Sequence, residues 1–290
     1  MEPSEGYVKV LGFRLFYRTY GKPTKGTVLC LHGGPGATHD YLLSLEDLAQ
    51  FGYQVVMIDQ LGCGKSDRPH GTSLYTIPHN VEEVEAVRAA LRLGKVHLMG
   101  SSYGGALAIA TALKYQRRLK SLVVTGGLAS VPLTVREMRR LIGRLPPKVR
   151  ATIAKYEAME DYGNPRYLAA VAEFYRRHVC RLPVWPREVV YSFDHISKPV
   201  YYTMNGPNEF TIIGTIKDWD VTDQLPRIRL PTLVTVGRYD EVTPRVAREI
   251  HDGIRGSRLV QFEKSAHLAM WEERAHYIEV VRDFLEGVKA

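Results

Sequence analysis

The chain has 290 residues, with 39 Lys plus Arg and 31 Asp plus Glu, which gives a net charge of +8 when the histidines are neutral. With 45% hydrophobic and 24% charged residues, the composition is that of a globular protein and excludes a disordered chain, a collagen or a coiled coil. The length predicts roughly two domains, or one large α/β domain that carries an insertion.

The positive charge is spread along the chain, with no run of five like charges and no aromatic–basic RNA motif. No nucleic-acid partner is therefore expected. Residues 1–10 lack the apolar core of a signal peptide, and no stretch approaches the ~20 apolar residues of a membrane span. The three cysteines, Cys30, Cys63 and Cys180, form no CxxC pair. We expect a cytoplasmic protein without a disulfide framework and without a membrane partner.

Short apolar runs alternate with helical patterns along the first 127 residues. Tyr7–Tyr20 predicts a hairpin that breaks near Gly12. The elements predicted after it are strands at 27–31, 53–58, 95–99 and 119–124, and helices at 42–51, 80–93 and 105–115. Buried strands that alternate with helices predict an α/β fold, in which helices cover both faces of a mainly parallel central sheet.

This alternation stops between residues 128 and 216, where helix signals and aromatic residues replace it. It resumes with strands at 231–236 and 258–263 and helices at 243–254 and 271–288. We therefore predict a core domain formed by residues 1–127 and 217–290, with a helical cap domain inserted at 128–216.

Gly100-Ser-Ser-Tyr-Gly104 matches the G-x-S-x-G pattern of a nucleophile elbow. An apolar strand precedes it and a helix of small residues follows, which is the context that the pattern requires. Ser102 is the predicted nucleophile, because Ser101 occupies the wrong position in the pattern. The alternative is an ordinary Gly/Ser-rich turn between a strand and a helix.

A glycine-rich loop, His32-Gly-Gly-Pro-Gly36, follows an earlier strand. In hydrolases with an elbow serine, such a loop supplies one N–H group to the oxyanion hole, and the residue after the nucleophile supplies the other. The predicted donors are Gly34 and Tyr103, with Gly33 as the rival of Gly34. The alternative is that the loop is only a turn.

An elbow serine needs an acid and then a histidine later in the chain. Asp240 and His267 lie in loops at the carboxyl ends of strands, where parallel sheets form their sites. The alternative acids are Asp220, Asp223 and Glu241, and the weaker alternative bases are His251 and His276. We predict acyl transfer in which His267 takes the proton of Ser102 and Asp240 orients His267.

Other reaction classes lack their sequence signals. No His, Asp and Glu cluster has metal-ligand spacing, and no phosphate loop is present. Gly62-x-Gly64 lacks the third glycine of a dinucleotide-binding motif, since Asp67 stands in its place. No metal and no cofactor is expected.

Three motifs together resemble the proline iminopeptidase family of α/β-hydrolases: the HGGPG loop at 32–36, the segment at 59–66 and the elbow at 100–105. The likeness continues through Asn205–Phe210 of the predicted cap to Asp240 and His267, and covers nearly the whole chain. It is strongest to the archaeal aminopeptidases of this family that interact with tricorn protease. The resemblance implies an α/β-hydrolase fold with an inserted cap.

The resemblance also implies a serine aminopeptidase that releases N-terminal proline and other apolar residues from short peptides. It implies Ser102, Asp240 and His267 as the catalytic triad, with Glu209 and Glu241 binding the substrate amine. Without it, both glutamates would be interpreted as solvated loop charges. A tricorn-like protease is a candidate partner on resemblance alone. The alternative functions are an esterase, amidase or C–C hydrolase with the same triad, or a non-catalytic receptor on this fold.

Overall fold

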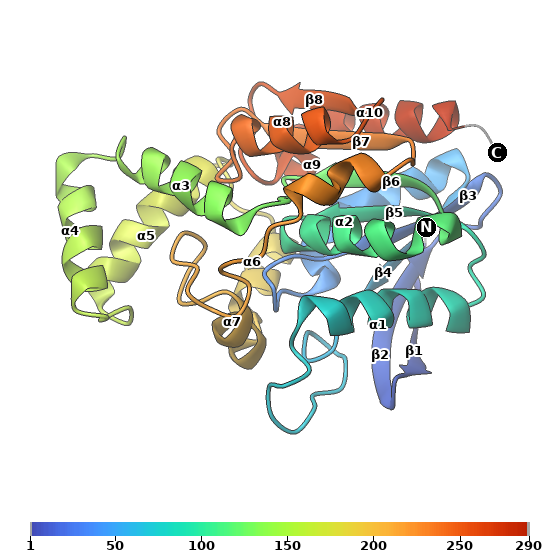
Figure 1. Cartoon of the computed structure of the whole chain (residues 1–290), viewed down its shortest axis with the longest axis horizontal. Helices are drawn as coiled ribbons and strands as arrows, with labels where there is room; N and C mark the ends of the chain where they lie inside the picture. The colour runs from blue at the N-terminus through green and yellow to red at the C-terminus, as the bar shows by residue number, and fades with distance from the viewer. Residues whose placement is uncertain (1, 289–290) are drawn as a thin grey trace.

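The computed structural model describes residues 2–288, and its centre is an eight-stranded sheet with the order β1-β2-β4-β3-β5-β6-β7-β8 (Figure 1). The strands are β1 (Ser4–Val10), β2 (Phe13–Tyr20), β3 (Gly26–Leu31), β4 (Tyr53–Ile58), β5 (Val96–Ser101), β6 (Leu119–Thr125), β7 (Thr232–Gly237) and β8 (Arg258–Phe262). β1 and β2 pair as the predicted hairpin, and all pairs from β4 to β8 are parallel. The predicted α/β fold with a mainly parallel sheet is confirmed.

Helices cover both faces of this sheet. The helices are η1 (His39–Phe51), α1 (Ile77–Ala90), α2 (Tyr103–Tyr115), η2 (Gln116–Arg118), α3 (Val131–Ile142), α4 (Pro147–Ala158), α5 (Pro165–His178), α6 (Arg187–Asp194), α7 (Lys198–Met204), η3 (Thr222–Arg227), α8 (Pro244–Gly253), α9 (Ala269–Glu272) and α10 (Arg274–Gly287). α1, α2 and α8 pack with one hydrophobic cluster, and η1 and α10 pack with a second. Along β3, Leu29 and Leu31 belong to the first cluster, whereas Val28 and Cys30 belong to the second. Successive side chains thus point to opposite faces of the sheet, as expected for a strand that is buried on both faces.

Helices α3 to α7 lie between β6 and β7 in the chain and project to one side of the sheet (Figure 1). Buried Met138, Phe174 and Met204 of these helices belong to the same cluster as α1 and α2. Because one hydrophobic cluster runs through both parts, the division into a core and a cap at 128–216 stays a prediction. Residues 1, 289 and 290 of the predicted core domain lie outside the described residues.

Two predicted helices differ in the structure. α1 begins at Ile77 rather than residue 80, because the Thr76 side chain accepts a hydrogen bond from the N–H of His79 and caps it. The single helix predicted for 271–288 is wrong: α9 and α10 are separated at Glu273. The carboxylate of Glu273 accepts hydrogen bonds from the backbone N–H of Lys264 and the hydroxyl of Ser265, so this residue serves the neighbouring loop.

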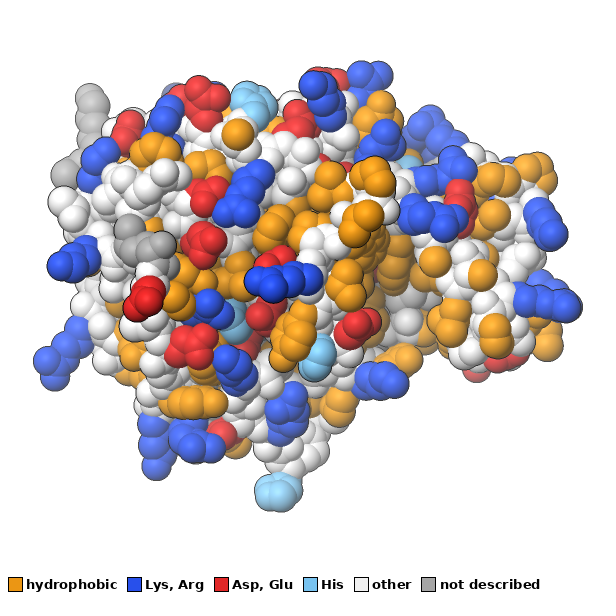
Figure 2. Space-filling view, turned by 180° about the vertical axis from the view of Figure 1, so that it is seen from behind, with side chains coloured by type: hydrophobic (Ala, Val, Ile, Leu, Met, Phe, Trp, Pro, Cys, Tyr) orange, Lys and Arg blue, Asp and Glu red, His pale blue; other side chains and the backbone are white. Residues whose placement is uncertain are grey.

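Charged side chains of both signs are interspersed on the face shown in Figure 2, with apolar side chains between them. Between residues 2 and 288, no helix has the length and apolar character needed to cross a membrane.

Candidate active site

The nucleophile elbow joins β5 to α2. Ser102 has φ of 59° and ψ of −127°, a conformation that is strained for a residue with a side chain. A Cβ atom on Gly100 would collide with the carbonyl of Gly104, and one on Gly104 would collide with that of Leu31. The N–H of Ser102 donates to the carbonyl of Thr125 at 2.9 Å, which ties the elbow to the end of β6. The two glycines of the motif are thus required by close backbone approach.

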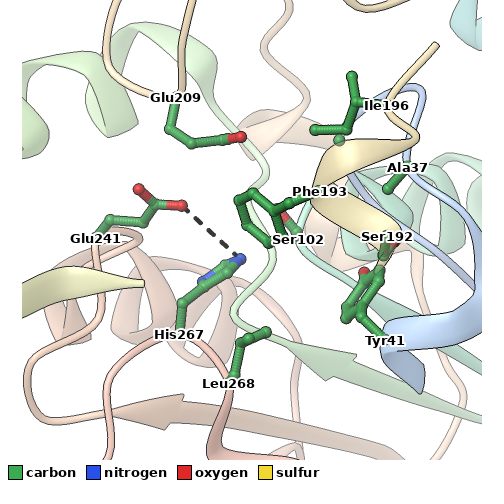
Figure 3. A pocket seen from close by; sticks show the side chains of 11 residues that line it. Ala37, Tyr41, Ser102, Ser192, Phe193, Ile196, Glu209, Glu241, His267 and Leu268 are labelled. Atoms are coloured by element: carbon green, nitrogen blue, oxygen red, sulfur yellow. Dashed lines mark ion pairs between the residues drawn. The ribbon is translucent and has the colours of Figure 1, made fainter. Parts of the chain in front are cut away.

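Asp240 and His267 meet at the ends of β7 and β8. The Nδ1 atom of His267 lies 2.7 Å from Oδ1 of Asp240, and both side chains are buried. The same Oδ1 accepts the N–H of Val242 at 2.8 Å, which fixes the carboxylate. Because Nδ1 faces the acid, Nε2 is directed to the pocket that His267 and Ser102 both line (Figure 3). This is the arrangement that a base needs to act on a serine hydroxyl.

The alternative acids and bases lie elsewhere. Asp220 accepts hydrogen bonds from Ser130 and Thr222, and Asp223 is in η3; neither lines the pocket with Ser102. His251 bonds to Ser257, and His276 is exposed beside Glu279. Of the candidate acids, Asp240 and Glu241 are the two near His267.

The hydrogen bonds of the glycine-rich loop after β3 distinguish between the two candidate oxyanion donors, Gly33 and Gly34. The N–H of Gly33 donates to the Tyr41 hydroxyl at 2.7 Å and is therefore occupied. The N–H of Gly34 forms no hydrogen bond within residues 2–288, and Gly34 lines the pocket with Ser102. Tyr103 is the first residue of α2, where backbone N–H groups lack partners within the helix. The geometry favours Gly34 over Gly33, and the predicted pair of Gly34 and Tyr103 is available for an oxyanion.

Side chains that the sequence analysis did not single out hold this loop. Nδ1 of His32 lies 3.0 Å from the carbonyl of Gly33, and Nε2 accepts the N–H of Gln60 at 3.1 Å. The amide of Gln60 donates back to the carbonyl of His32 at 2.7 Å. The hydroxyl of Tyr41 faces the carbonyl of Ser101 at 3.4 Å, so it connects the loop to the elbow. His32 is the first residue of the loop motif and Gln60 lies in the motif at 59–66, whereas Tyr41 carried no sequence signal.

Glu209 and Glu241 line the same pocket as Ser102 and His267 (Figure 3). Oε1 of Glu241 lies 4.0 Å from Nε2 of His267. Oε1 of Glu209 accepts the Tyr201 hydroxyl at 2.8 Å, whereas Oε2 of Glu241 has no hydrogen-bond partner within residues 2–288. Burial raises the pKa of both carboxyls, and the Glu209 charge raises the pKa of Glu241 further.

These carboxylates also act on the histidine. Burial by itself would lower the pKa of His267, but the charge and hydrogen bond of Asp240 outweigh it. Glu241 and Glu209 add to the same effect, so the pKa of His267 is raised. The carboxyl groups of this pocket therefore favour a cation beside them.

The C-terminal end of α5 and the residue after it connect the loop of Asp240 to the loop of His267. The carbonyl of His178 accepts the N–H of Glu241 at 3.1 Å, and the carbonyl of Val179 accepts the N–H of His267 at 3.1 Å. Nδ1 of His178 also lies 2.8 Å from the carbonyl of Tyr239. The segment between β6 and β7 thus hydrogen-bonds to the backbone of both loops. No sequence motif indicated this connection.

The comparisons with known proteins agree over nearly the full chain. The family described as alpha/beta hydrolase fold matches residues 26–274. A proline iminopeptidase of Saccharolobus solfataricus is 54% identical over 287 residues, which cover 98% of this chain and 93% of that protein. The crystal structure of VinJ has a TM-score of 0.95 at 39% identity and covers 99% of each chain. The proline iminopeptidase of Mycobacterium smegmatis has a TM-score of 0.91 at 34% identity, with 98% of each chain covered. This chain belongs to the proline iminopeptidase family of the α/β-hydrolases.

Proposed function

We propose that this protein is a serine aminopeptidase that releases N-terminal proline and other apolar residues from short peptides through an acyl-enzyme. The observation that carries the proposal is the pair of carboxylates, Glu209 and Glu241, in one pocket with Ser102 and His267. The names of the relatives support proline as one N-terminal residue.

The carboxylate pair suits a substrate with a free amino group. Within the described residues, Oε2 of the buried Glu241 has no hydrogen-bond partner, and Glu209 is held by a neutral hydroxyl rather than by a cation. Burial makes the charged form of both carboxyls unfavourable, and an ammonium group between them relieves this cost through charge-assisted hydrogen bonds. The pair would also place the amine at a set distance from Ser102, so that the first peptide bond lies at the nucleophile.

The proposed reaction proceeds in two acyl transfers. His267 takes the proton of Ser102 through Nε2 while Oγ attacks the first peptide carbonyl, and the N–H groups of Gly34 and Tyr103 stabilise the oxyanion. His267 then gives that proton to the leaving nitrogen, the C–N bond breaks and the shortened peptide departs. Water then attacks the acyl-enzyme while His267 takes its proton, the ester bond breaks as His267 passes that proton to Oγ of Ser102, and the free amino acid leaves. Asp240 stabilises the imidazolium in both steps.

Neutralising each glutamate tests the proposal. Glu209→Gln and Glu241→Gln should each lower kcat/KM for a prolyl amide about 10–200-fold, because one charge-assisted hydrogen bond of ~1.5–3 kcal/mol is lost. A simple acetate ester has no amine and should lose far less. The matched control is Glu263→Gln, an exposed glutamate that pairs with Arg238 outside the pocket. Equal losses on amide and ester would contradict amine recognition and leave a general esterase or amidase.

A further inference from the structure

Two separate cavities meet at Ser102, and they extend in different directions. Both are lined by Gly34, Ser102, Glu209 and Glu241. The first continues along Ala37, Phe193, Ile196 and Leu268, and the second along Leu128, Val131, Met138 and Trp219. The two cavities are similar in size, so volume does not distinguish them. Any peptide cleaved at Ser102 has two sides, and each side needs one of these cavities.

The position of the histidine distinguishes the cavities. His267 lines the first cavity and does not line the second, whereas Tyr103 lines the second and does not line the first. The group that protonates a leaving nitrogen must lie within hydrogen-bond reach of it. The leaving nitrogen, and the residue that carries it, must therefore lie on the side of the first cavity.

The wall of the first cavity is held firmly on the oxyanion loop. The hydroxyl of Ser192, beside Phe193, accepts the N–H of Thr38 at 3.1 Å and donates to the carbonyl of Thr38 at 3.1 Å. The N–H of Ser197 donates to the carbonyl of Gly36 at 2.8 Å. The Phe193 ring packs edge-to-face on Trp185, with ring centroids 5.3 Å apart. The wall is therefore fixed to the glycine-rich loop, and Phe193 and Ile196 lie near Ala37 of that loop in Figure 3.

We propose that this first cavity binds the side chain of the second residue of the peptide, and that Phe193 and Ile196 select apolar side chains there. The proposal rests on the proposed aminopeptidase function. Within the described residues no Lys or Arg lines the cavity, and its charged groups other than His267 are the two glutamates. An acidic second residue would meet the like charge of the two glutamates with no Lys or Arg to offset it, whereas an aliphatic or aromatic one would bury its surface on the wall.

The test compares two selectivity ratios in two variants. The first ratio is kcat/KM for prolyl-leucinamide over that for prolyl-glycinamide, which reports on the leaving side. The second is kcat/KM for prolyl-glycinamide over that for alanyl-glycinamide, which reports on the acyl side. Phe193→Ala should lower the first ratio about tenfold, as expected when an apolar wall is removed from a pocket, and leave the second within about twofold. Met138→Ala, in the opposite cavity, is the matched control and should change only the second ratio.

If Phe193→Ala does not fold, Ile196→Ala provides an independent test of the first ratio. Ile196 is partly exposed, so its truncation should disturb the fold little. An unchanged first ratio in both wall variants, or a first ratio that falls in Met138→Ala, would overturn the assignment. If the wild-type protein cleaves no prolyl amide, the aminopeptidase proposal fails separately. The cavity is then tested with benzyl and methyl acetate, whose alcohols leave past His267: Phe193→Ala should lower the benzyl-to-methyl ratio, and an unchanged ratio would reject the cavity assignment.

Discussion

The loops at the carboxyl edge of the sheet and the segment between β6 and β7 supply different parts of this pocket. Ser102, Asp240 and His267 each follow a strand closely and come from the first region. Glu209, Phe193 and the carbonyls of His178 and Val179 come from the second. In the proposed reaction, the first region supplies the groups that exchange protons and form bonds, and the second supplies groups that contact the substrate or position the loops.

This difference has a physical origin. A strand that ends at a sheet edge presents the next residue at a place set by backbone hydrogen bonding, so a reactive group there is held precisely. The helical segment packs through side chains, such as Tyr201 on Glu209 and Trp185 on Phe193. Substitutions in the loops at the carboxyl ends of the strands should therefore lower activity on every substrate. Substitutions in the helical segment should lower activity on some substrates more than on others.

The largest expected effect is that of Ser102→Ala, which removes the nucleophile. We expect kcat to fall about 10⁶-fold on amides and esters alike, as in other serine hydrolases. Covalent labelling by a serine-directed inhibitor, followed by mass spectrometry, is the measurement. Ser101→Ala is the control, because the Ser101 hydroxyl has no hydrogen-bond partner in the described chain and should be dispensable. Normal labelling of Ser102→Ala would place the nucleophile elsewhere.

Asp240→Asn should lower kcat about 10⁴-fold on both substrate classes, because an amide favours the wrong tautomer of His267. Steady-state kinetics at saturating substrate measures this, with circular dichroism to show that the fold is kept. The matched control is Asp223→Asn, since Asp223 lies in η3 and does not line the pocket. A large loss in Asp223→Asn with little loss in Asp240→Asn would make the acid assignment wrong.

Glu241→Gln sharpens the comparison, because Glu241 sits in a sheet-edge loop yet is proposed to bind substrate. Its charge contributes to the raised pKa of His267. A general base must be neutral to act, so the acidic limb of kcat/KM reports the pKa of His267 in the free enzyme. Removing the charge lowers that pKa, and the limb should move to lower pH.

The measurement for Glu241→Gln is a pH profile on an uncharged ester, which has no amine to complicate the result. Glu279→Gln, exposed on α10, serves as its control and should leave the limb in place. A limb that stays fixed or moves to higher pH in Glu241→Gln would show that this carboxylate does not act on the histidine.

Chelation should have the smallest effect. Neither region brings together three His, Cys, Asp or Glu side chains that could hold a metal ion within residues 2–288, and the proposed chemistry needs none. Full activity is expected after incubation with EDTA and gel filtration. Loss of activity that zinc restores would contradict a serine mechanism.

Much of the sheet-edge region could be predicted from local sequence. The G-x-S-x-G pattern between a strand and a helix identified the elbow, and the structure shows the close backbone contacts that require its glycines. The order of acid and histidine after later strands identified Asp240 and His267, and the structure brings them to 2.7 Å. Helix boundaries were less accurate, because the Thr76 cap and the loop role of Glu273 depend on single side-chain contacts.

The sequence by itself therefore determined the α/β fold, the family and the three candidate reactive residues, because strands and turns leave local patterns of apolar, glycine and charged positions. Only the tertiary structure decided that the N–H of Gly33 donates to Tyr41 while that of Gly34 has no partner among residues 2–288, and that His178 and Val179 join the two loops. It alone also separated two cavities on either side of Ser102. These features depend on contacts between segments distant in the chain, and such contacts are set by packing rather than by any local pattern.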